Sequence, residues 1–460
     1  MRAVFLLLSL LLLTSGYAMD PPAIVWVKYF FAGGRSYLFS IQQLMDQGYI
    51  AVGFKSQGPG APSDSCLFRF SQNGDLLWSK GVSGFTWDIA NWAEELSDGA
   101  LIVTGSCKDV NETSHGLFLS KFDSSGDEIW VRFYDSPATN DQGNCVIALD
   151  DGYAIAGDRG DDAWIIRTDL QGDSLWSVRV SDPHYLNARR ILLVDDALVT
   201  YITGINPRIV ALSVDDGQLL WEADDFPSAY PSYDDDYGDM TCSTTDGGYT
   251  LVTAFYPNIV HTDELGNVLW YYEVPYWSCP FSSSISNTMD GGYIYGGINT
   301  EQPDDPGSNY SGMVVKFDSE GNEHWRDYVY ECIDLFCIRQ LSSGGYIACG
   351  AKGGQGTLLR YAPETGIEGE SITGGLTITS LSTNPFSSVL EVQFSVPECS
   401  QVDLCVYDLY GRLTATVEHD VFPAGDHSAQ WVPEGVPSGC YLVRLSTPGT
   451  SVVRRCVYIE

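Results

Sequence analysis

The chain has 460 residues, with 60 acidic and 24 basic side chains and a formal net charge of −36. A surface this acidic repels phosphate backbones and anionic lipid head groups, which argues against nucleic acid as a partner. Aromatic residues reach 13% and charged residues only 18%, a composition typical of a folded protein rather than of a disordered acidic chain.

The first 18 residues have the layout of a secretory signal peptide. Arg2 gives a positive start, residues 4–13 are apolar except for Ser9, and small residues follow. This pattern predicts cleavage between Ala18 and Met19. The apolar run is too short to span a membrane, so we expect no transmembrane anchor. Export would allow the 12 cysteines to form disulfides, although their pairing cannot be read from the sequence.

Tryptophan marks an internal repeat of 45 to 55 residues, at Trp26, Trp78, Trp130, Trp176, Trp221, Trp270 and Trp325. All but Trp26 follow a glycine by four positions, at Gly74, Gly126, Gly172, Gly217, Gly266 and Gly321. About 20 residues after most of the tryptophans comes an acidic–glycine–aromatic turn such as Asp151-Gly152-Tyr153. A period of this length, without helical periodicity, indicates a β-propeller of four-stranded blades.

The second repeat illustrates the expected blade, with strands over residues 87–95, 100–105, 116–123 and 127–131. The last unit, over residues 326–361, lacks a fourth strand, which residues 22–30 would supply. The fold class predicted is therefore all-β, with a seven-bladed β-propeller over residues 19–361. A solenoid of stacked sheets is the competing architecture, but a closed ring leaves no exposed sheet edge.

The run Ala211-Leu-Ser-Val-Asp-Asp-Gly-Gln-Leu-Leu-Trp221 resembles the pyrroloquinoline-quinone-type propeller repeat, or PQQ-like repeat. The resemblance covers residues 22–361 and concerns architecture. Quinone-dependent dehydrogenases of this repeat type commonly hold their cofactor with calcium and a vicinal cysteine pair. No two cysteines are adjacent here, so we expect no quinone cofactor.

The tryptophan period stops near Pro363, and residues 362–375 have the composition of a linker. Residues 376–460 contain six or seven short strand patterns, which predict a small immunoglobulin-like antiparallel β-sandwich. Four motifs stand in order along this tail, and their main residues are Asn384, Pro385, Tyr407, Asp408, Gly411, Arg412, Gly425, Gly439 and Tyr441.

These motifs resemble the C-terminal sorting domain, type A, of the type IX secretion system. The resemblance implies recognition by the secretion machinery, transport across an outer membrane, removal of the domain, and attachment to the surface or release. Cys440 and the final Glu460 depart from the family pattern. The related module of flagellar hook-capping proteins and an ordinary sandwich with a surface-binding role are the alternatives.

No catalytic constellation is visible in the sequence. The six histidines lack metal-ligand spacing, and there is no nucleophile elbow or phosphate loop. An acidic loop offers Asp234, Asp235, Asp236 and Asp239 as weak calcium candidates, with a solvated loop as the alternative. Four aspartates three residues before turn glycines are expected to cap those turns, at Asp123, Asp169, Asp263 and Asp318.

The sequence thus favours a non-catalytic propeller that is secreted by a Gram-negative-type bacterium or displayed on its outer-membrane surface. This propeller is expected to bind an extracellular glycan or protein. One alternative is a secreted polysaccharide lyase or hydrolase with acidic residues at the propeller axis, which needs two carboxylates about 5 to 10 Å apart. A structural adhesin is a second alternative. Tryptophans outside the repeat frame, including Trp92 and Trp164, are interpreted as either core or ligand-binding residues.

Overall fold

The computed structural model describes residues 20–460, apart from segments 31–33, 57–62, 82–87, 108–115, 135–140, 183–184, 205–206, 225, 227–237, 243–245, 254–257, 274–277, 300–310, 365–375, 382–385, 398, 409–412, 434, 438, 448–449 and 459–460. The signal-peptide prediction, with Ala18 and Met19, lies outside the described residues. Every regular element in the described part of the chain is a β-strand, which confirms the all-β prediction.

Twenty-eight strands form seven four-stranded antiparallel sheets, numbered here 1 to 7 in chain order. Sheet 1 contains β2 (Arg35–Gln43), β3 (Tyr49–Ser56), β4 (Ser63–Phe70) and β5 (Leu76–Gly81). Sheet 2 contains β6 (Ile89–Glu95), β7 (Leu101–Cys107), β8 (Gly116–Phe122) and β9 (Glu128–Tyr134). Sheet 3 contains β10 (Asp141–Leu149), β11 (Gly152–Arg159), β12 (Asp162–Asp169) and β13 (Ser174–Val180).

The remaining four sheets repeat this order. Sheet 4 contains β14 (Leu186–Val194), β15 (Ala197–Gly204), β16 (Arg208–Ser213) and β17 (Leu219–Ala223). Sheet 5 contains β18 (Asp239–Cys242), β19 (Tyr249–Val252), β20 (Asn258–Thr262) and β21 (Val268–Glu273). Sheet 6 contains β22 (Ser278–Asn287), β23 (Tyr293–Asn299), β24 (Ser311–Phe317) and β25 (Glu323–Val329). Sheet 7 contains β26 (Asp334–Gln340), β27 (Tyr346–Lys352), β28 (Gln355–Tyr361) and β1 (Ile24–Phe30).

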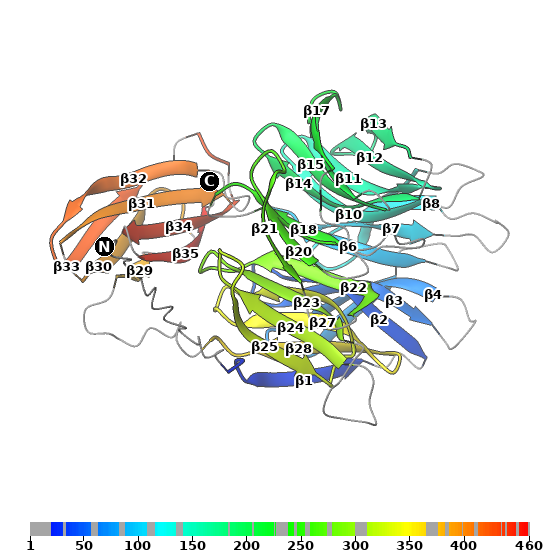
Figure 1. Ribbon diagram of the computed structural model, residues 1–460, viewed down its shortest axis with the longest axis horizontal. Coiled ribbons are helices and arrows are strands. Elements are labelled where there is room, and N and C mark those ends of the chain that lie inside the picture. The colour runs from blue at the N-terminus through cyan, green and yellow to red at the C-terminus, as the bar shows by residue number, and fades with distance from the viewer. Residues whose placement is uncertain are drawn as a thin grey trace, which may run out of the picture.

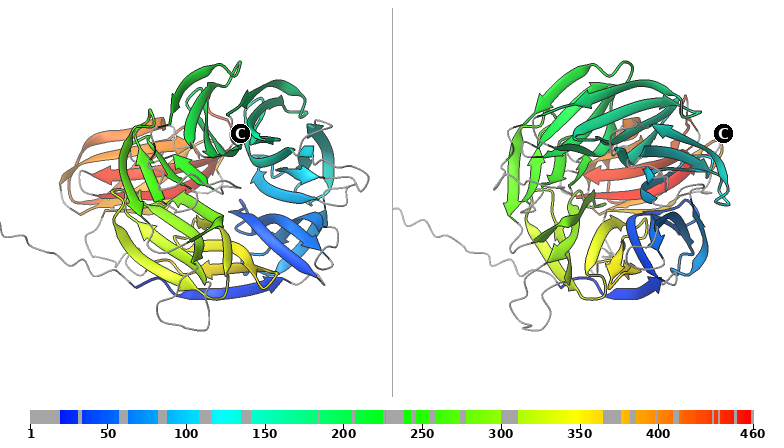
Figure 2. Two further views of the ribbon diagram at one scale, coloured as in Figure 1. Left: turned by 45° about the vertical axis from the view of Figure 1, so that its right-hand side comes forward. Right: turned by 90° about the vertical axis from the view of Figure 1, so that its right-hand side faces the viewer.

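The sheets follow one another around a closed circuit. The first strand of each sheet packs against the first strand of the next, from β2 through to β26, and β26 packs against β2 again (Figures 1 and 2). The ring closes through antiparallel pairing of β1 with β28, so the predicted role of residues 22–30 is confirmed. The amide of Ala362 also donates to the carbonyl of Ala23 at 2.9 Å.

Neighbouring sheets interlock through the tryptophan and glycine of the repeat. Each turn glycine has a φ near +80° and lies against the indole of the preceding sheet, as Gly74 does on Trp26 and Gly126 on Trp78. A Cβ at Gly74 would lie 2.6 Å from the Trp26 ring. Only glycine tolerates both the positive φ and this approach. In each Gly-x-x-x-Trp run the glycine therefore packs on the tryptophan of the preceding sheet, and the tryptophan of the run packs on the following sheet.

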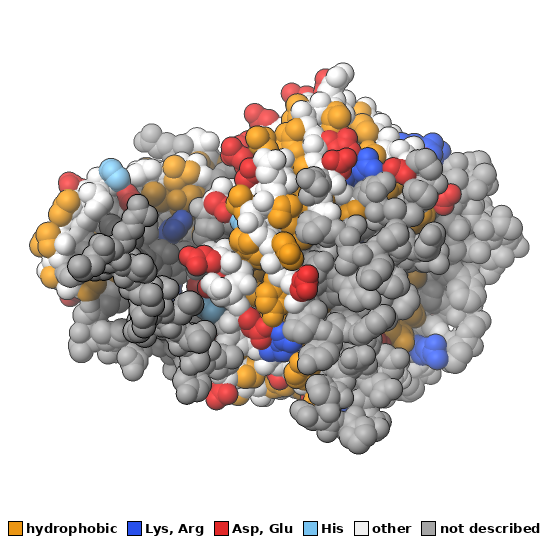
Figure 3. All heavy atoms as spheres, viewed as in Figure 1, with side chains coloured by type: hydrophobic (Ala, Val, Ile, Leu, Met, Phe, Trp, Pro, Cys, Tyr) orange, Lys and Arg blue, Asp and Glu red, His pale blue; other side chains and the backbone are white. Residues whose placement is uncertain are grey.

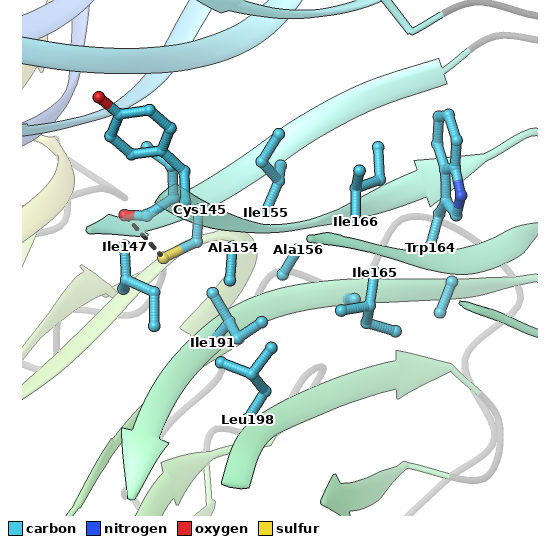
Figure 4. Packing of buried hydrophobic residues seen from close by; sticks show 14 of the residues in the cluster. Cys145, Ile147, Ala154, Ile155, Ala156, Trp164, Ile165, Ile166, Ile191 and Leu198 are labelled. Carbon is cyan, nitrogen blue, oxygen red and sulfur yellow. Dashed lines mark hydrogen bonds between the residues drawn. The ribbon is translucent and has the colours of Figure 1, made fainter. Parts of the chain in front are cut away.

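A tyrosine on the second strand adds to this contact in five sheets. The ring centroids lie 5.9 to 6.3 Å apart in the pairs Trp26–Tyr49, Trp130–Tyr153, Trp221–Tyr249, Trp270–Tyr293 and Trp325–Tyr346. Trp325 is fully buried, since it meets the closing sheet, where Tyr361 also packs on it. Apolar side chains fill the rest of each interface, as between Ile165 of sheet 3 and Ile191 of sheet 4 (Figure 4).

The predicted aspartate caps are confirmed. Asp123 Oδ1 accepts hydrogen bonds from the amides of Ser125 and Asp127, both at 2.9 Å, and Asp169, Asp263 and Asp318 cap their turns in the same way. A second aspartate, in the turn between the first two strands, pairs with a basic residue of the third strand. The pairs are Asp46–Arg69, Asp98–Lys121, Asp151–Arg167, Asp246–His261 and Asp290–Lys316.

The tail of the chain forms two further sheets around one apolar core. One contains β29 (Thr377–Leu381), β30 (Leu390–Val396) and β33 (Gly425–Trp431). The other contains β31 (Ser400–Asp408), β32 (Leu413–Phe422), β34 (Gly439–Thr447) and β35 (Thr450–Tyr458). Val402, Leu404 and Val406 are buried on one face of β31, as their alternation predicted. In Figure 1 this unit lies beside the ring.

The interlock can be tested with two glycines of the same backbone conformation. Gly74 and Gly247 both have a φ of +76°, but no atom of the described residues lies within 4 Å of a Cβ at Gly247. Gly247→Ala should lower the free energy of unfolding by about 1–2 kcal/mol, the cost of the left-handed conformation alone. Gly74→Ala should lose a further 1–3 kcal/mol or so, because the Trp26 ring must move. Urea unfolding of both variants measures this difference, and equal losses would contradict the interlock.

Candidate functional site

The inner strands of the ring carry a β-bulge at the same position in five sheets. The residues at these bulges, here called the bulge ring, are Phe39, Asn91, Asn144, Arg189 and Phe336. A bulge changes the direction in which the neighbouring side chains point, and bulges are frequent next to functional sites. Since the five lie at one level of the ring, they define the level at which a site would be built.

The residue after the bulge, or the equivalent residue in sheets 5 and 6, is serine, tryptophan, cysteine, arginine or aspartate. Cross-strand pairing makes seven positions equivalent, namely Ser40, Trp92, Cys145, Arg190, Asp239, Ser284 and Cys337. The next residue along each strand is a buried apolar one, in the order Ile41, Ala93, Val146, Ile191, Met240, Ile285 and Ile338. The apolar position is repeated to pack the sheets, whereas the position before it differs from sheet to sheet.

Five of these side chains, and two that lie two residues further along their strands, meet across the axis. We call Trp92, Glu94, Cys145, Arg190, Asp239, Ser284 and Arg339 the axial cluster. They come from sheets 2 to 7. Contacts between sheets that are not neighbours, such as Arg190 of sheet 4 with Trp92 of sheet 2, place the cluster at the centre of the ring.

Two arginines share one carboxylate in this cluster. Arg190 Nε lies 3.7 Å from Asp239 Oδ1, and Arg339 Nη1 lies 3.7 Å from Asp239 Oδ2. These distances are ion pairs but not hydrogen bonds. The short bonds to Asp239 Oδ2 come instead from the amide of Ile285 at 3.0 Å and the hydroxyl of Ser284 at 3.2 Å. Arg339 Nη1 donates to Ser284 Oγ at 2.9 Å.

Both guanidinium groups lie close to the indole of Trp92. Arg190 stands 3.8 Å from the centroid of the indole and Arg339 stands 5.4 Å from it. Cation–π contacts of this kind stabilise a cation most strongly where water is excluded, and Trp92 is only 8% exposed. The tryptophan thus offsets part of the cost of holding two positive groups together inside the ring.

Glu94 is the second carboxylate of the cluster. Burial raises its pKa to about 7, although the amide of Ala148 and the charge of Arg190 oppose the shift. Asp158, on the bulge side of the ring, has its pKa raised to about 7 for the same reason, opposed by Arg189 and by amide donors. Two carboxyl groups that titrate near neutral pH therefore lie close to the axis.

The bulge ring divides into an aromatic and a polar half. Phe39 and Phe336 pack together at 5.0 Å, and Phe54 and Tyr37 stack beside them at 5.2 Å. All four of these aromatic side chains are partly exposed. On the other side, Asn91 donates to the carbonyl of Gly143, and Asn144 bonds to Asp158 and Asn187. Stacking faces beside amide groups are the combination that polar, partly apolar ligands require.

Asp239, predicted as a weak calcium ligand, begins β18 and belongs to the axial cluster, where it forms ion pairs with two arginines. Asp234, Asp235 and Asp236 lie outside the described residues. In the described part of the chain no three His, Cys, Asp or Glu side chains are grouped to hold a metal. His261 is the third-strand basic residue of sheet 5, and its Nε2 lies 2.9 Å from Asp246 Oδ2, so it belongs to the repeat. Trp164 is buried beneath Arg159.

The predicted sorting residues fall on the two tail sheets where they are described. Tyr441 is buried in β34, with its ring 5.2 Å from Trp431 and its hydroxyl bonded to the carbonyl of Pro437. Tyr407 and Asp408 end β31, Gly425 begins β33 with a φ of +127°, and Gly439 begins β34. Asn384, Pro385, Gly411 and Arg412 lie outside the described residues, but Phe386, which follows Pro385, is buried against Trp431.

Comparison with known proteins supports the repeat. Residues 161–332, from the start of β12 to beyond β25, match a family model described as outer membrane protein assembly factor BamB, over well under half of the chain. No curated protein matches the sequence. The family match supports a PQQ-like repeat over these residues, and the sheet order is that of a β-propeller. Among the described residues there is no helix able to cross a membrane.

Three solved structures are similar to the chain at low sequence identity. A fungal alcohol oxidase of the AA5 family, in complex with copper, has a TM-score of 0.53 at 9% identity and covers 96% of this chain and 100% of its own. BamB from Moraxella catarrhalis has a TM-score of 0.44 at 13% identity, over 74% and 100%. PorZ, a surface component of the type IX secretion system of Porphyromonas gingivalis, has a TM-score of 0.45 at 11% identity, over 92% and 59%. The oxidase likeness shows a shared fold.

Glu94 gives the axis a defined pH dependence. The unfolded chain releases the Glu94 proton near pH 4.5, whereas the folded protein holds it to about pH 7. The stability that this group contributes is therefore full below pH 4.5 and is lost as the pH rises through 7. Glu94→Gln removes that dependence, so the variant should gain on the order of 2 kcal/mol relative to wild type between pH 5 and pH 8. Urea unfolding at each pH measures it, and a constant difference would contradict it.

Proposed function

We propose that the chain is an exported, seven-bladed propeller that binds an extracellular glycan or protein through the axis of its ring. The observation that carries the proposal is the set of equivalent positions after the bulges, where buried polar residues replace the apolar packing that the repeat favours. Buried charges are costly, so evolution retains them where they serve specificity or ligand binding. The aromatic half of the bulge ring supports the same reading.

We further propose that residues 376–460 are an immunoglobulin-like sorting sandwich of the type IX secretion system, joined to the propeller (19–361) by a linker over residues 362–375. The motif order in the sequence supports this assignment, as does the packing of Phe386 and Tyr441 into one core. The destination would be the outer-membrane surface or the medium of a Gram-negative-type bacterium. Calcium binding by the loop at Asp234, Asp235 and Asp236 stays a proposal.

The sorting assignment is testable by location. In a host with type IX secretion, the full-length protein should reach the surface or medium, while a form ending at Glu370 should stay in the periplasm. The shorter form keeps Glu364, whose carboxylate accepts a hydrogen bond from Tyr346, and so keeps the whole ring. Residues 371–460 fused to a periplasmic reporter should carry it outward. The assignment fails if both forms of the protein reach one place.

A secreted polysaccharide lyase or hydrolase is the second candidate. Glu94 and Asp239 favour it, since they bring two carboxylates from different sheets into one cluster, and the raised pKa of Glu94 is suited to an acid catalyst. The contacts of Asp239 with Arg190 and Arg339 favour binding over catalysis.

We expect the purified mature protein to release no reducing ends or unsaturated sugars from acidic or neutral polysaccharides. Release that is abolished in both Glu94→Gln and Asp239→Asn would instead establish the enzyme. Release that survives both substitutions would indicate a contaminating activity, so the two variants serve as each other's check.

A further inference from the structure

The axial cluster holds three hydrogen-bond donors without acceptors. Nε of Arg190, Nη2 of Arg339 and Nε1 of Trp92 are buried and have no hydrogen-bond partner within the described part of the chain. A buried donor without an acceptor costs about 1–3 kcal/mol, so three in one cluster are a substantial penalty. An acceptor group that enters the cluster would recover this energy.

The charge of the cluster points to an anion. Two guanidinium groups face the single carboxylate of Asp239, and burial favours the neutral form of Glu94. While Glu94 is protonated, the two guanidinium groups therefore exceed the ionised carboxylates of the cluster by one, in a protein whose net charge is −36. The two arginine side chains are 15–16% exposed, so solvent reaches them. A monoanion with oxygen acceptors, such as a carboxylate, matches both the charge and the donors.

The surroundings indicate what would carry this carboxylate. Phe39, Phe54, Phe336 and Tyr37 offer partly exposed ring faces at the level of the bulges, and Asn91 offers an amide at the same level. Pyranose rings have apolar faces that stack on aromatic side chains and hydroxyls that bond to amides. An acidic sugar combines these features with a carboxylate, whereas a peptide C terminus lacks the repeated stacking face.

We propose that the axial cluster binds the carboxylate of a uronic-acid residue in an acidic oligosaccharide, with Arg190, Arg339 and Trp92 as donors. The proposal rests on the proposed function and specifies its ligand. The aromatic half of the bulge ring stacks on a neighbouring sugar, and Asn91 bonds to a sugar hydroxyl. Asp239 holds the two arginines in place and does not contact the ligand.

The test is calorimetric titration of the mature protein with matched ligands. The probes are a trisaccharide of galacturonic acid, a trisaccharide of galactose, and a tripeptide with either a free or an amidated C terminus. The galacturonic acid trisaccharide should bind at least tenfold more tightly than the galactose trisaccharide. Equal binding of the two sugars would overturn the carboxylate assignment while leaving a glycan-binding propeller. Binding of the free tripeptide alone would replace the glycan by a protein partner, and no binding of any probe would overturn the proposed function as well.

Variants locate the site. Arg190→Lys and Arg339→Lys should each weaken binding of the galacturonic acid trisaccharide at least tenfold, because lysine cannot supply the guanidinium fork. Arg360→Lys is the matched control, since Arg360 of β28 also has a buried Nε without a partner among the described residues but lies at the third-strand position outside the cluster. It should leave binding unchanged. Equal weakening in all three variants, or none in the first two, would place the ligand elsewhere. The wild-type comparison of the two sugars stands even if a variant fails to fold.

Discussion

Six of the seven repeat indoles rest on a glycine of the next sheet, and this contact governs the rest of the architecture. The glycine has no side chain and a positive φ, so the turn that carries it can close over the flat face of the tryptophan. Each sheet gives one indole and receives another, and none can bury both of its faces alone. At the closure, where no turn joins β28 to β1, Tyr361 and Tyr346 cover Trp325 instead. The aspartate caps keep the glycine turns in shape.

The two ends of each sheet follow different rules. The outer turns repeat their residues almost unchanged, because the interlock demands the same shape in every sheet. The inner strands repeat only the apolar residue that packs between sheets, and the residue beside it varies from Ser40 to Trp92 to Arg190. Acidic residues outnumber basic ones in the chain, and their side chains are scattered over the face in Figure 3, yet the centre gathers arginines. The repeated residues thus hold the sheets together, whereas the proposed ligand site is built from residues that are not repeated.

This division explains what the sequence could predict. The spacing of Gly74 and Trp78 recurs along the chain and predicted the repeat, and the aspartate caps could be inferred from the same turns. The contact of Gly74 with Trp26 of the preceding sheet was not predicted. The pairing of residues 22–30 with the last sheet followed from counting the units. The axial cluster leaves no such trace, since Arg190 and Arg339 are far apart in the chain and share no motif. Their meeting depends on the closure of the ring and on bulges that shift five of the inner strands by one residue, which residue patterns do not show. Asp239 was singled out for its acidic neighbours, whereas its partners come from three other sheets.

The non-covalent closure of the ring also determines which contacts form last during folding. Sheet 7 takes its outer strand from the start of the chain and its other three from far downstream, and Ser36 of sheet 1 bonds to Gly356 across 320 residues. Contacts of such separation form late, because the loop between them must close first. The ring cannot be completed until residue 361 has been made available, so β1 must wait unpaired throughout synthesis. An exported chain would gain from that delay, since a polypeptide that lacks its last sheet stays open enough to be threaded through a membrane channel before it locks.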